Sequence, residues 1–223
     1  MSARIAALLP MRHSSERVPG KNYRVLAGRP LYHHIVLALQ ICPSIDEIVI
    51  DTDSEWIMRD AASVFPDVRV LERPAHLRDG MIPMNDVLLN DIDQVPAKLY
   101  LQTHSTNPLL RSETIERSIA AFAASRETHD SLFGVTRIQT RLWTADGKPL
   151  NHDPAVLLRT QDLPPLFEEN SCIYLFEGET LRRRRTRIGE RPLLFEIAAS
   201  EAMDIDEEVD WQIVAAIFAQ TDQ

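Results

Sequence analysis

The chain has 223 residues, two cysteines and a formal net charge of −9. This length allows one large domain with a substantial core, and the acidic balance argues against a nucleic-acid partner. Cys42 and Cys172 belong to no CxxC pair, so we expect buried reduced thiols rather than a zinc site or disulfide framework. No signal peptide is evident, and no apolar run approaches the ~20 residues of a membrane span. We therefore expect a cytoplasmic enzyme or binding protein with no membrane partner.

Apolar, strand-like runs alternate with helical patterns along most of the chain. The patterns predict strands at 5–9, 47–51, 68–71, 98–102, 132–138 and 172–176, and helices at 30–39, 55–64, 85–92, 112–124 and 208–219. Ser54 or Asp53 is predicted to cap the helix at 55–64, and Ser112 the helix at 112–124. The alternation predicts an α/β fold with helices on both faces of a parallel or mixed sheet. Segments 10–22, 51–54 and 102–109 should then meet in one crevice at the carboxyl ends of the strands.

A turn-rich stretch, 144–169, separates the last two predicted strands. A substrate lid, a dimerisation arm and an irregular surface excursion all stay open for it. The arginines at 182–185, extended by Arg187, indicate a solvated helix face because no aromatic residues are interleaved. His33, His34 and the tryptophans Trp56, Trp143 and Trp211 show no ligand spacing, so we expect packing or surface roles.

The first predicted strand opens directly into a cationic loop that carries Arg12, Arg17 and Lys21. A buried strand followed by a positive, turn-rich loop is a common phosphate site in α/β proteins. Arginine can clamp a phosphate through two hydrogen bonds, and lysine adds a compact charge. Asn22 follows Gly20-Lys21 where the Walker A pattern has Ser or Thr, so an ATPase of that class is disfavoured.

A second candidate site is the acidic stretch 201–211 near the carboxyl terminus. Asp204 and Asp206 are separated by one residue, which places both carboxylates on one side of an extended segment. Neighbouring carboxylates repel unless a cation lies between them, and Mg²⁺ prefers such oxygen ligands. The alternative is that these acidic residues only favour the start of the following helix.

These two segments resemble the CMP-sialic acid and CMP-Kdo synthetases, the sugar-acid cytidylyltransferases. Their loop signature is matched with departures at His13-Ser14 and Glu16, and 202–211 resembles their Ala-Ile-Asp-Ile-Asp stretch, whose aspartates bind the catalytic metal. A third similarity lies at 101–110, and two weaker ones lie at 72–77 and 169–174. The matched loop positions are Pro10, Arg12, Ser15, Arg17, Pro19, Gly20, Lys21 and Asn22.

The resemblance implies a Rossmann-like nucleotidyltransferase fold with a mostly parallel sheet in a three-layer arrangement. It implies one domain, 1–223, with a dimerisation or lid insertion at about 139–170, and a homodimer. The implied reaction transfers CMP from CTP to an acidic sugar (sialic acid, Kdo or a related nonulosonic acid) and releases pyrophosphate. The implied cofactor is Mg²⁺, and the cytosine preference comes from the resemblance alone.

Residue roles follow from the same resemblance. Arg12, Lys21 and Asp206 are implied to be catalytic, and Asp204 and Asp206 to bind the metal, with Asp210 in support. Gln102, His104 and Asn170 are implied to contact the acceptor. The implied nucleotide contacts are Pro10, Arg12, Ser15, Lys21, Asn22 and Arg73.

Three alternatives stay open. The acceptor of the same reaction can be another acidic molecule, such as a phosphonate. A sugar-phosphate nucleotidyltransferase that uses UTP or GTP is a second alternative, although such enzymes usually carry a Gly-rich loop and this chain has seven glycines in all. The third is a nucleotide-binding protein that has lost catalysis, which magnesium-dependent turnover would exclude.

Overall fold

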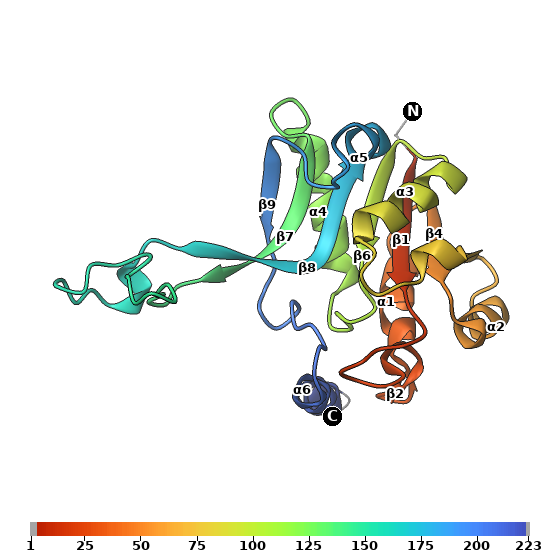
Figure 1. Cartoon of the computed structure of the whole chain (residues 1–223), viewed down its shortest axis with the longest axis horizontal. Coiled ribbons are helices and arrows are strands. Elements are labelled where there is room, and N and C mark those ends of the chain that lie inside the picture. The colour runs from red at the N-terminus through yellow and green to blue at the C-terminus, as the bar shows by residue number, and fades with distance from the viewer. Residues whose placement is uncertain (1–3, 222–223) are drawn as a thin grey trace.

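The computed structural model describes residues 4–221, and one seven-stranded sheet organises them. The strand order is β5-β4-β1-β6-β8-β7-β9, and β8 alone among these strands runs antiparallel to its neighbours (Figure 1). The predicted mostly parallel α/β sheet is therefore confirmed. The strands are β1 (Ile5–Met11), β4 (Glu47–Thr52), β5 (Arg69–Glu72), β6 (Leu99–Thr103), β7 (Ser131–Ile138), β8 (Leu166–Glu177) and β9 (Pro192–Glu196), with a separate pair β2 (Val25–Leu26) and β3 (Arg29–Pro30).

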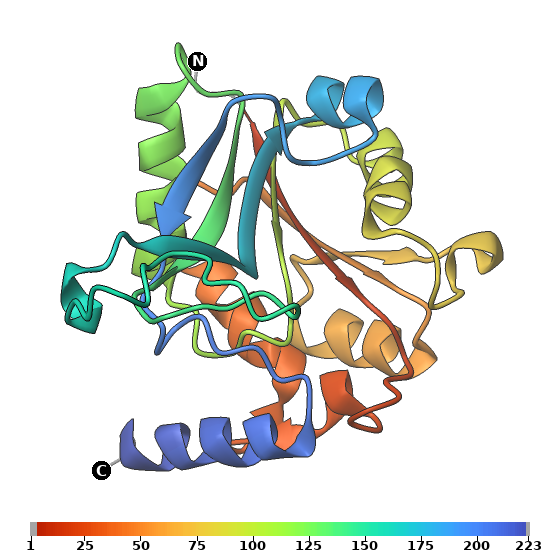
Figure 2. The ribbon, with the colours of Figure 1, turned by 60° about the vertical axis from the view of Figure 1, so that its left-hand side comes forward.

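Helices cover both faces of the sheet because strand residues alternate between two cores. Ala7 and Leu9 of β1 share a core with α1 (Leu31–Gln40), α2 (Glu55–Val64) and α4 (Ser112–Ser125). Ala6 and Leu8 share the opposite core with α3 (Met84–Gln94) and α5 (Gly178–Arg184), so that α4 and α3 lie on opposite sides in Figure 2. The expected three-layer arrangement follows.

The last helix, α6 (Glu208–Thr221), packs away from the sheet against the loop that follows β1 (Figure 1). Trp211 and Val214 of α6 form a small core with Val18 and Leu31. Arg24 strengthens this contact, because its guanidinium lies 4.2 Å from the Trp211 ring centroid. The C-terminal helix therefore packs beside the loop that follows the first strand.

The capping residue was predicted correctly at α2 and wrongly at α4. The Ser54 hydroxyl accepts a hydrogen bond from the Ile57 backbone N–H at 3.3 Å, as a capping residue does. At α4 the N-cap position belongs to Arg111, and Ser112 is already helical. The reason is Glu201, whose carboxylate accepts from both the backbone N–H and the guanidinium of Arg111 and so holds Arg111 outside the helix.

Residues 139–165, between β7 and β8, form an arm that projects from the body of the protein (Figure 1). Strand β8 begins earlier than predicted because 166–169 continue the pairing with β7 along the base of the arm. Ser171, at φ 58°, then interrupts the ladder. The arm exposes several apolar side chains: Trp143, Leu150, Val156, Leu157 and Leu158.

Two further expectations concern the cysteines and membrane spans. Cys42 and Cys172 are free and buried, as predicted, and burial raises the pKa of each thiol to about 12. Among residues 4–221, no helix is both long and apolar enough to cross a membrane.

Candidate active site

The segments that follow β1, β5 and β6 surround a cavity of about 690 Å³, closed on one side by the stretch before α6. The shared direction of these strands explains the convergence, since parallel strands end at the same edge of a sheet. Gln102 and Asn170 do not line the cavity. The other predicted site residues do: Pro10, Arg12, Ser15, Lys21, Asn22, Arg73, His104, Asp204 and Asp206.

Backbone turns and one amide fix the loop after β1. Gly20 has φ +67°, and a Cβ there would lie 2.9 Å from the Tyr23 ring, so glycine is required on both counts. The Asn22 amide donates to the Arg12 carbonyl at 2.7 Å and accepts from the Ser105 hydroxyl at 2.7 Å. Asn22 therefore ties the loop to the segment after β6, with both ends of its side chain engaged.

The loop cations differ in how they are held. Arg12 is exposed and makes no ion pair within the described chain; a Cβ at Gly80 would lie 2.6 Å from its Nη1. Lys21 is buried, and its Nζ donates to the Ile205 carbonyl at 2.5 Å and lies 3.5 Å from Asp206 Oδ1. Arg17 reaches the same Asp206 oxygen at 2.8 Å.

The aspartate pair lies beside Lys21 and Arg17. Asp204 Oδ1 is buried without a hydrogen-bond partner, and burial, with the charge of Asp206 added, raises the Asp204 pKa. Asp210 Oδ2 accepts from the backbone N–H groups of Asp206 and Glu207, at 3.0 and 2.7 Å, and so holds the start of α6. Asp210 thus supports the pair through the backbone.

The aspartate pair would supply some of the ligands of a divalent cation, and the protein would not supply the rest. The unpartnered buried oxygen of Asp204 and the half-exposed Asp206 carboxylate are the hard oxygen ligands that Mg²⁺ prefers. Within residues 4–221 no cluster of three or more His, Cys, Asp or Glu side chains is placed to hold a metal. The remaining ligands would therefore be substrate phosphates and water.

On the β6 side, Gln102 lies behind His104. Gln102 is fully buried, and its Nε2 donates to the Thr103 carbonyl at 3.0 Å and to His104 Nε2 at 2.9 Å. Because His104 Nε2 accepts this hydrogen bond, the imidazole is neutral. Burial, aided by the charges of Arg187 and Lys21, lowers the His104 pKa to about 3. His104 therefore offers the cavity a neutral ring.

Asn170 lies in the interrupted part of β8 rather than at the cavity. Its Nδ2 donates to the Thr136 hydroxyl at 3.1 Å, and its Oδ1 accepts from the Cys172 backbone N–H at 3.2 Å. A Cβ at Gly134 would lie 2.6 Å from that oxygen, so a glycine on β7 makes room for the amide. These contacts place Asn170 at the base of the arm.

Sequence reasoning missed Arg187. The preceding arginines are surface ion-paired, for example Arg182 with Asp93 at 2.9 Å and Arg185 with Asp86 at 2.7 Å. The Arg187 guanidinium instead lies 3.6 Å from the Tyr174 ring centroid, and its Nη1 is buried without a hydrogen-bond partner. The chain turns inward at Arg185, whose φ of 59° ends α5. Arginine at that position gives no helix-end signal, whereas glycine would have.

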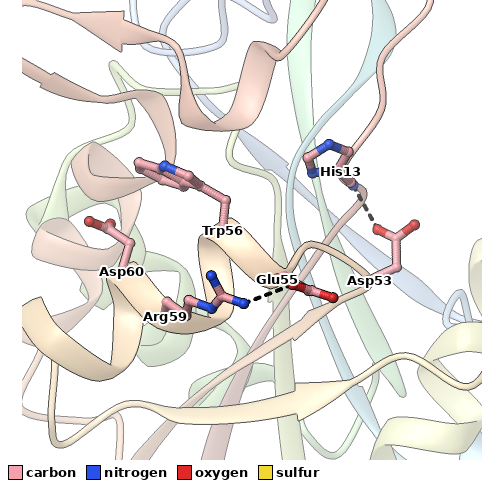
Figure 3. A pocket seen from close by; sticks show the side chains of 6 residues that line it. All are labelled: His13, Asp53, Glu55, Trp56, Arg59 and Asp60. Atoms are coloured by element: carbon pink, nitrogen blue, oxygen red, sulfur yellow. Dashed lines mark hydrogen bonds and ion pairs between the residues drawn. The ribbon is translucent and has the colours of Figure 1, made fainter.

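The segment 51–54 does not join the main cavity as expected. Asp51 is buried behind Arg73, and Asp53 borders a second cavity of about 690 Å³ (Figure 3). The His13 backbone N–H donates to Asp53 Oδ1 at 2.7 Å, and its ring stacks on Tyr23 with centroids 5.2 Å apart. The segment thus braces the first loop from outside. The second cavity is lined by His13, Asp53, Glu55, Trp56, Arg59 and Asp60.

Comparisons with known proteins agree with this arrangement. The chain is 27% identical to a CMP-N,N'-diacetyllegionaminic acid synthase of Legionella pneumophila over 94% of each chain. It is 23% identical to N-acylneuraminate cytidylyltransferase A of Danio rerio, of which it spans 50%. Its fold matches that of a CMP:2-keto-3-deoxy-manno-octonic acid synthetase solved with CTP, with a TM-score of 0.75 and 15% identity over 98% of this chain and 100% of that one.

The fold likeness confirms the predicted nucleotidyltransferase architecture. Residues 6–212 also match the model of the family described as "Cytidylyltransferase". This match spans nearly the whole chain, including the first loop, the cavity and the aspartate pair. The chain therefore belongs to the cytidylyltransferase family.

Proposed function

We propose that this enzyme transfers CMP from CTP to an acidic sugar (sialic acid, Kdo or a related nonulosonic acid), with Mg²⁺ as cofactor and pyrophosphate as the second product. The observation that carries the proposal is the single cavity in which loop cations face an aspartate pair. The relatives named for legionaminic and N-acylneuraminic acids support the acceptor class.

Catalysis would rest on positioning and charge. The acceptor oxygen attacks the α-phosphorus, and the bond to the departing pyrophosphate breaks, so no enzyme nucleophile is needed. Arg12, which has no ion pair of its own within residues 4–221, and Lys21, fixed by the Ile205 carbonyl, would hold the phosphates. Ser15 and Pro10 shape the loop wall of the cavity, and Arg73 approaches from the end of β5.

Asp204 and Asp206 would hold Mg²⁺ next to these cations. When bound there, the ion supplies positive charge to the α-phosphate and lowers the pKa of the attacking hydroxyl. Without it, the nearby carboxylates would repel the triphosphate. Lys21, whose Nζ lies 3.5 Å from Asp206 Oδ1, offsets part of this repulsion in the protein itself.

The acceptor side favours an anion. His104 is neutral and presents a ring without charge, while Arg187 keeps a buried Nη1 without a partner. A buried unpaired cationic group is costly. Arg187 does not line the cavity, but it lies close enough to His104 to lower the His104 pKa, and an acceptor carboxylate would be its partner. Gln102 would act through His104, and Asn170 would set the base of the arm beside the acceptor.

The homodimer is part of the same proposal. The arm exposes a row of apolar side chains, with Leu157 87% exposed, and a second copy of the chain would cover them. Sedimentation of the wild type beside Leu157→Asp tests this, and a wild type that sediments as a monomer at assay concentration would contradict it. The cytoplasmic location stays a prediction.

The deciding experiment measures pyrophosphate release from CTP and Mg²⁺ against sialic, legionaminic and pseudaminic acids, Kdo and small phosphonates. UTP, GTP and an EDTA blank run alongside. Release with one sugar acid and CTP alone, abolished by EDTA, is the expected result. Release with a phosphonate would change the acceptor class, and CTP binding without release from any acid would indicate a nucleotide-binding protein instead.

A further inference from the structure

Three ionisable side chains are buried behind the cavity wall. Asp51 is the next-to-last residue of β4, Arg73 follows β5, and Asp91 lies on α3. Their exposed fractions are 1%, 2% and 0%. Arg73 borders the cavity, whereas the two aspartates lie out of its reach. Whatever holds Arg73 therefore acts from the interior of the protein.

The Arg73 guanidinium bonds to one carboxylate oxygen of Asp51. Its Nε and Nη2 both contact Asp51 Oδ1, and Nη2 also lies 3.5 Å from the Asp51 carbonyl. The Oδ2 atoms of Asp51 and Asp91 are both buried without a hydrogen-bond partner among the described residues, and the two carboxyls lie close enough for each to shift the pKa of the other. Asp91 Oδ1 has a weak contact, at 3.4 Å, with the Asn90 amide.

One guanidinium cannot balance two buried carboxylates. Among residues 4–221, Asp53 also acts on the pair; it is negative and increases the imbalance, whereas the nearby Asn90 is neutral. A single proton between the two Oδ2 atoms resolves the conflict, because one oxygen then donates and the other accepts. Burial and the charge of Asp51 raise the Asp91 pKa to about 8, so the proton stays on at neutral pH.

We propose that Asp91 is a positioning residue of the nucleotide site: the proton it shares with Asp51 fixes the Asp51 carboxylate against Arg73 and so aims Arg73 at the bound nucleotide. This inference rests on the proposed function for its ligand. When the proton is lost, the two carboxylates repel and compete for Arg73. Nucleotide binding weakens as a result, while the chemical step is affected less.

The test compares the pH dependence of KM for CTP in the wild type and Asp91→Asn. The wild-type KM should rise above about pH 8, by up to about tenfold per pH unit for one linked proton. Asp91→Asn should keep a low KM across the range, because its amide donates permanently to Asp51. Asp93→Asn is the matched control: the same change on the same helix, at a side chain 67% exposed, should follow the wild type.

A second readout does not depend on turnover. Carbon-13 NMR of the aspartate carboxyls should show one buried carboxyl that stays protonated at neutral pH and is missing in Asp91→Asn. Identical KM profiles for the wild type and Asp91→Asn, or an Asp91 that is ionised at neutral pH, would overturn the inference. If neither the wild type nor the two variants turned over CTP, the proposed function would fail. The NMR titration would still decide whether the proton is shared.

Discussion

Two aspartate pairs near the cavity differ in what balances their charge. Asp51 and Asp91 are closed off from solvent, and Arg73 contacts only one of them. Asp204 and Asp206 border the cavity, where Asp206 is half exposed and meets both Arg17 and Lys21. The core pair has no access to an exchangeable ion, so a proton completes it. The pair at the cavity can exchange one cation for another.

Burial, rather than residue type, therefore decides the role of each pair. Desolvation makes an unbalanced charge costly, and the available partner depends on what can reach the site. The same reasoning applies to Arg187, whose buried Nη1 has no partner within residues 4–221. Arg187 does not itself line the cavity, but it lies close enough to His104, which does, to lower the His104 pKa. Under the proposed function its partner would be a substrate anion, as the partner of Asp206 would be Mg²⁺. The predictions below test these assignments.

The largest effect is expected when the cavity pair is broken. Asp206→Ala should lower kcat/KM for CTP by about 10³-fold or more, because the metal and phosphate charges lose a carboxylate partner. The fold should persist, since Asp206 is half exposed and Asp210 caps the backbone of α6 independently of the lost side chain. Pyrophosphate release and near-UV circular dichroism measure the two effects.

The neighbouring Glu207→Ala serves as the control for Asp206→Ala. Glu207 is exposed and its side chain makes no ion pair among the described residues, so activity should stay near normal. A folded Asp206→Ala enzyme with near-normal turnover would show that the pair does not hold the metal.

Removal of the fixed cation should have a smaller effect on turnover and a larger one on stability. Lys21→Ala should lower turnover by about 10²–10³-fold as a phosphate contact is lost. It should also lower the free energy of unfolding by about 1–3 kcal/mol, because the buried Ile205 carbonyl loses its donor. Pyrophosphate release and thermal unfolding give the two values. The exposed Lys98→Ala is the control, and unchanged turnover in Lys21→Ala would remove Lys21 from the mechanism.

The sequence predicts one of the two pairs and not the other. Asp204 and Asp206 are two residues apart, and Arg12 to Asn22 form one continuous loop. Local sequence patterns therefore reveal the cavity pair and the loop beside it. Asp51, Arg73 and Asp91 come from β4, the end of β5 and α3, and only the packed sheet brings them together. Arg187 stayed hidden for the same reason, since its neighbours in sequence are ordinary surface arginines.

Arg187 adds a third case to the comparison of the two aspartate pairs, because its buried Nη1 has no partner among the described residues. Arg187→Met should raise KM for the sugar acid about tenfold or more, the usual cost of losing a hydrogen bond between charged groups, and leave KM for CTP unchanged. Steady-state kinetics with each substrate varied in turn measures this. Arg183→Met, at an exposed side chain of α5, should match the wild type. An equal rise in both KM values would mean that Arg187 supports the fold of the cavity rather than the acceptor.

The smallest effect is expected at the cation that Mg²⁺ would displace. Arg17 contacts Asp206 Oδ1 at 2.8 Å, but its side chain is 60% exposed, and such surface ion pairs contribute little. Arg17→Gln should therefore lower the half-saturating Mg²⁺ concentration by less than about fivefold and leave the melting temperature unchanged. A Mg²⁺ titration of pyrophosphate release at saturating CTP measures the shift, with the exposed Arg29→Gln as control. A higher Mg²⁺ requirement in Arg17→Gln would mean that Arg17 binds substrate phosphate alongside the metal, and that the cavity pair does not exchange one cation for the other.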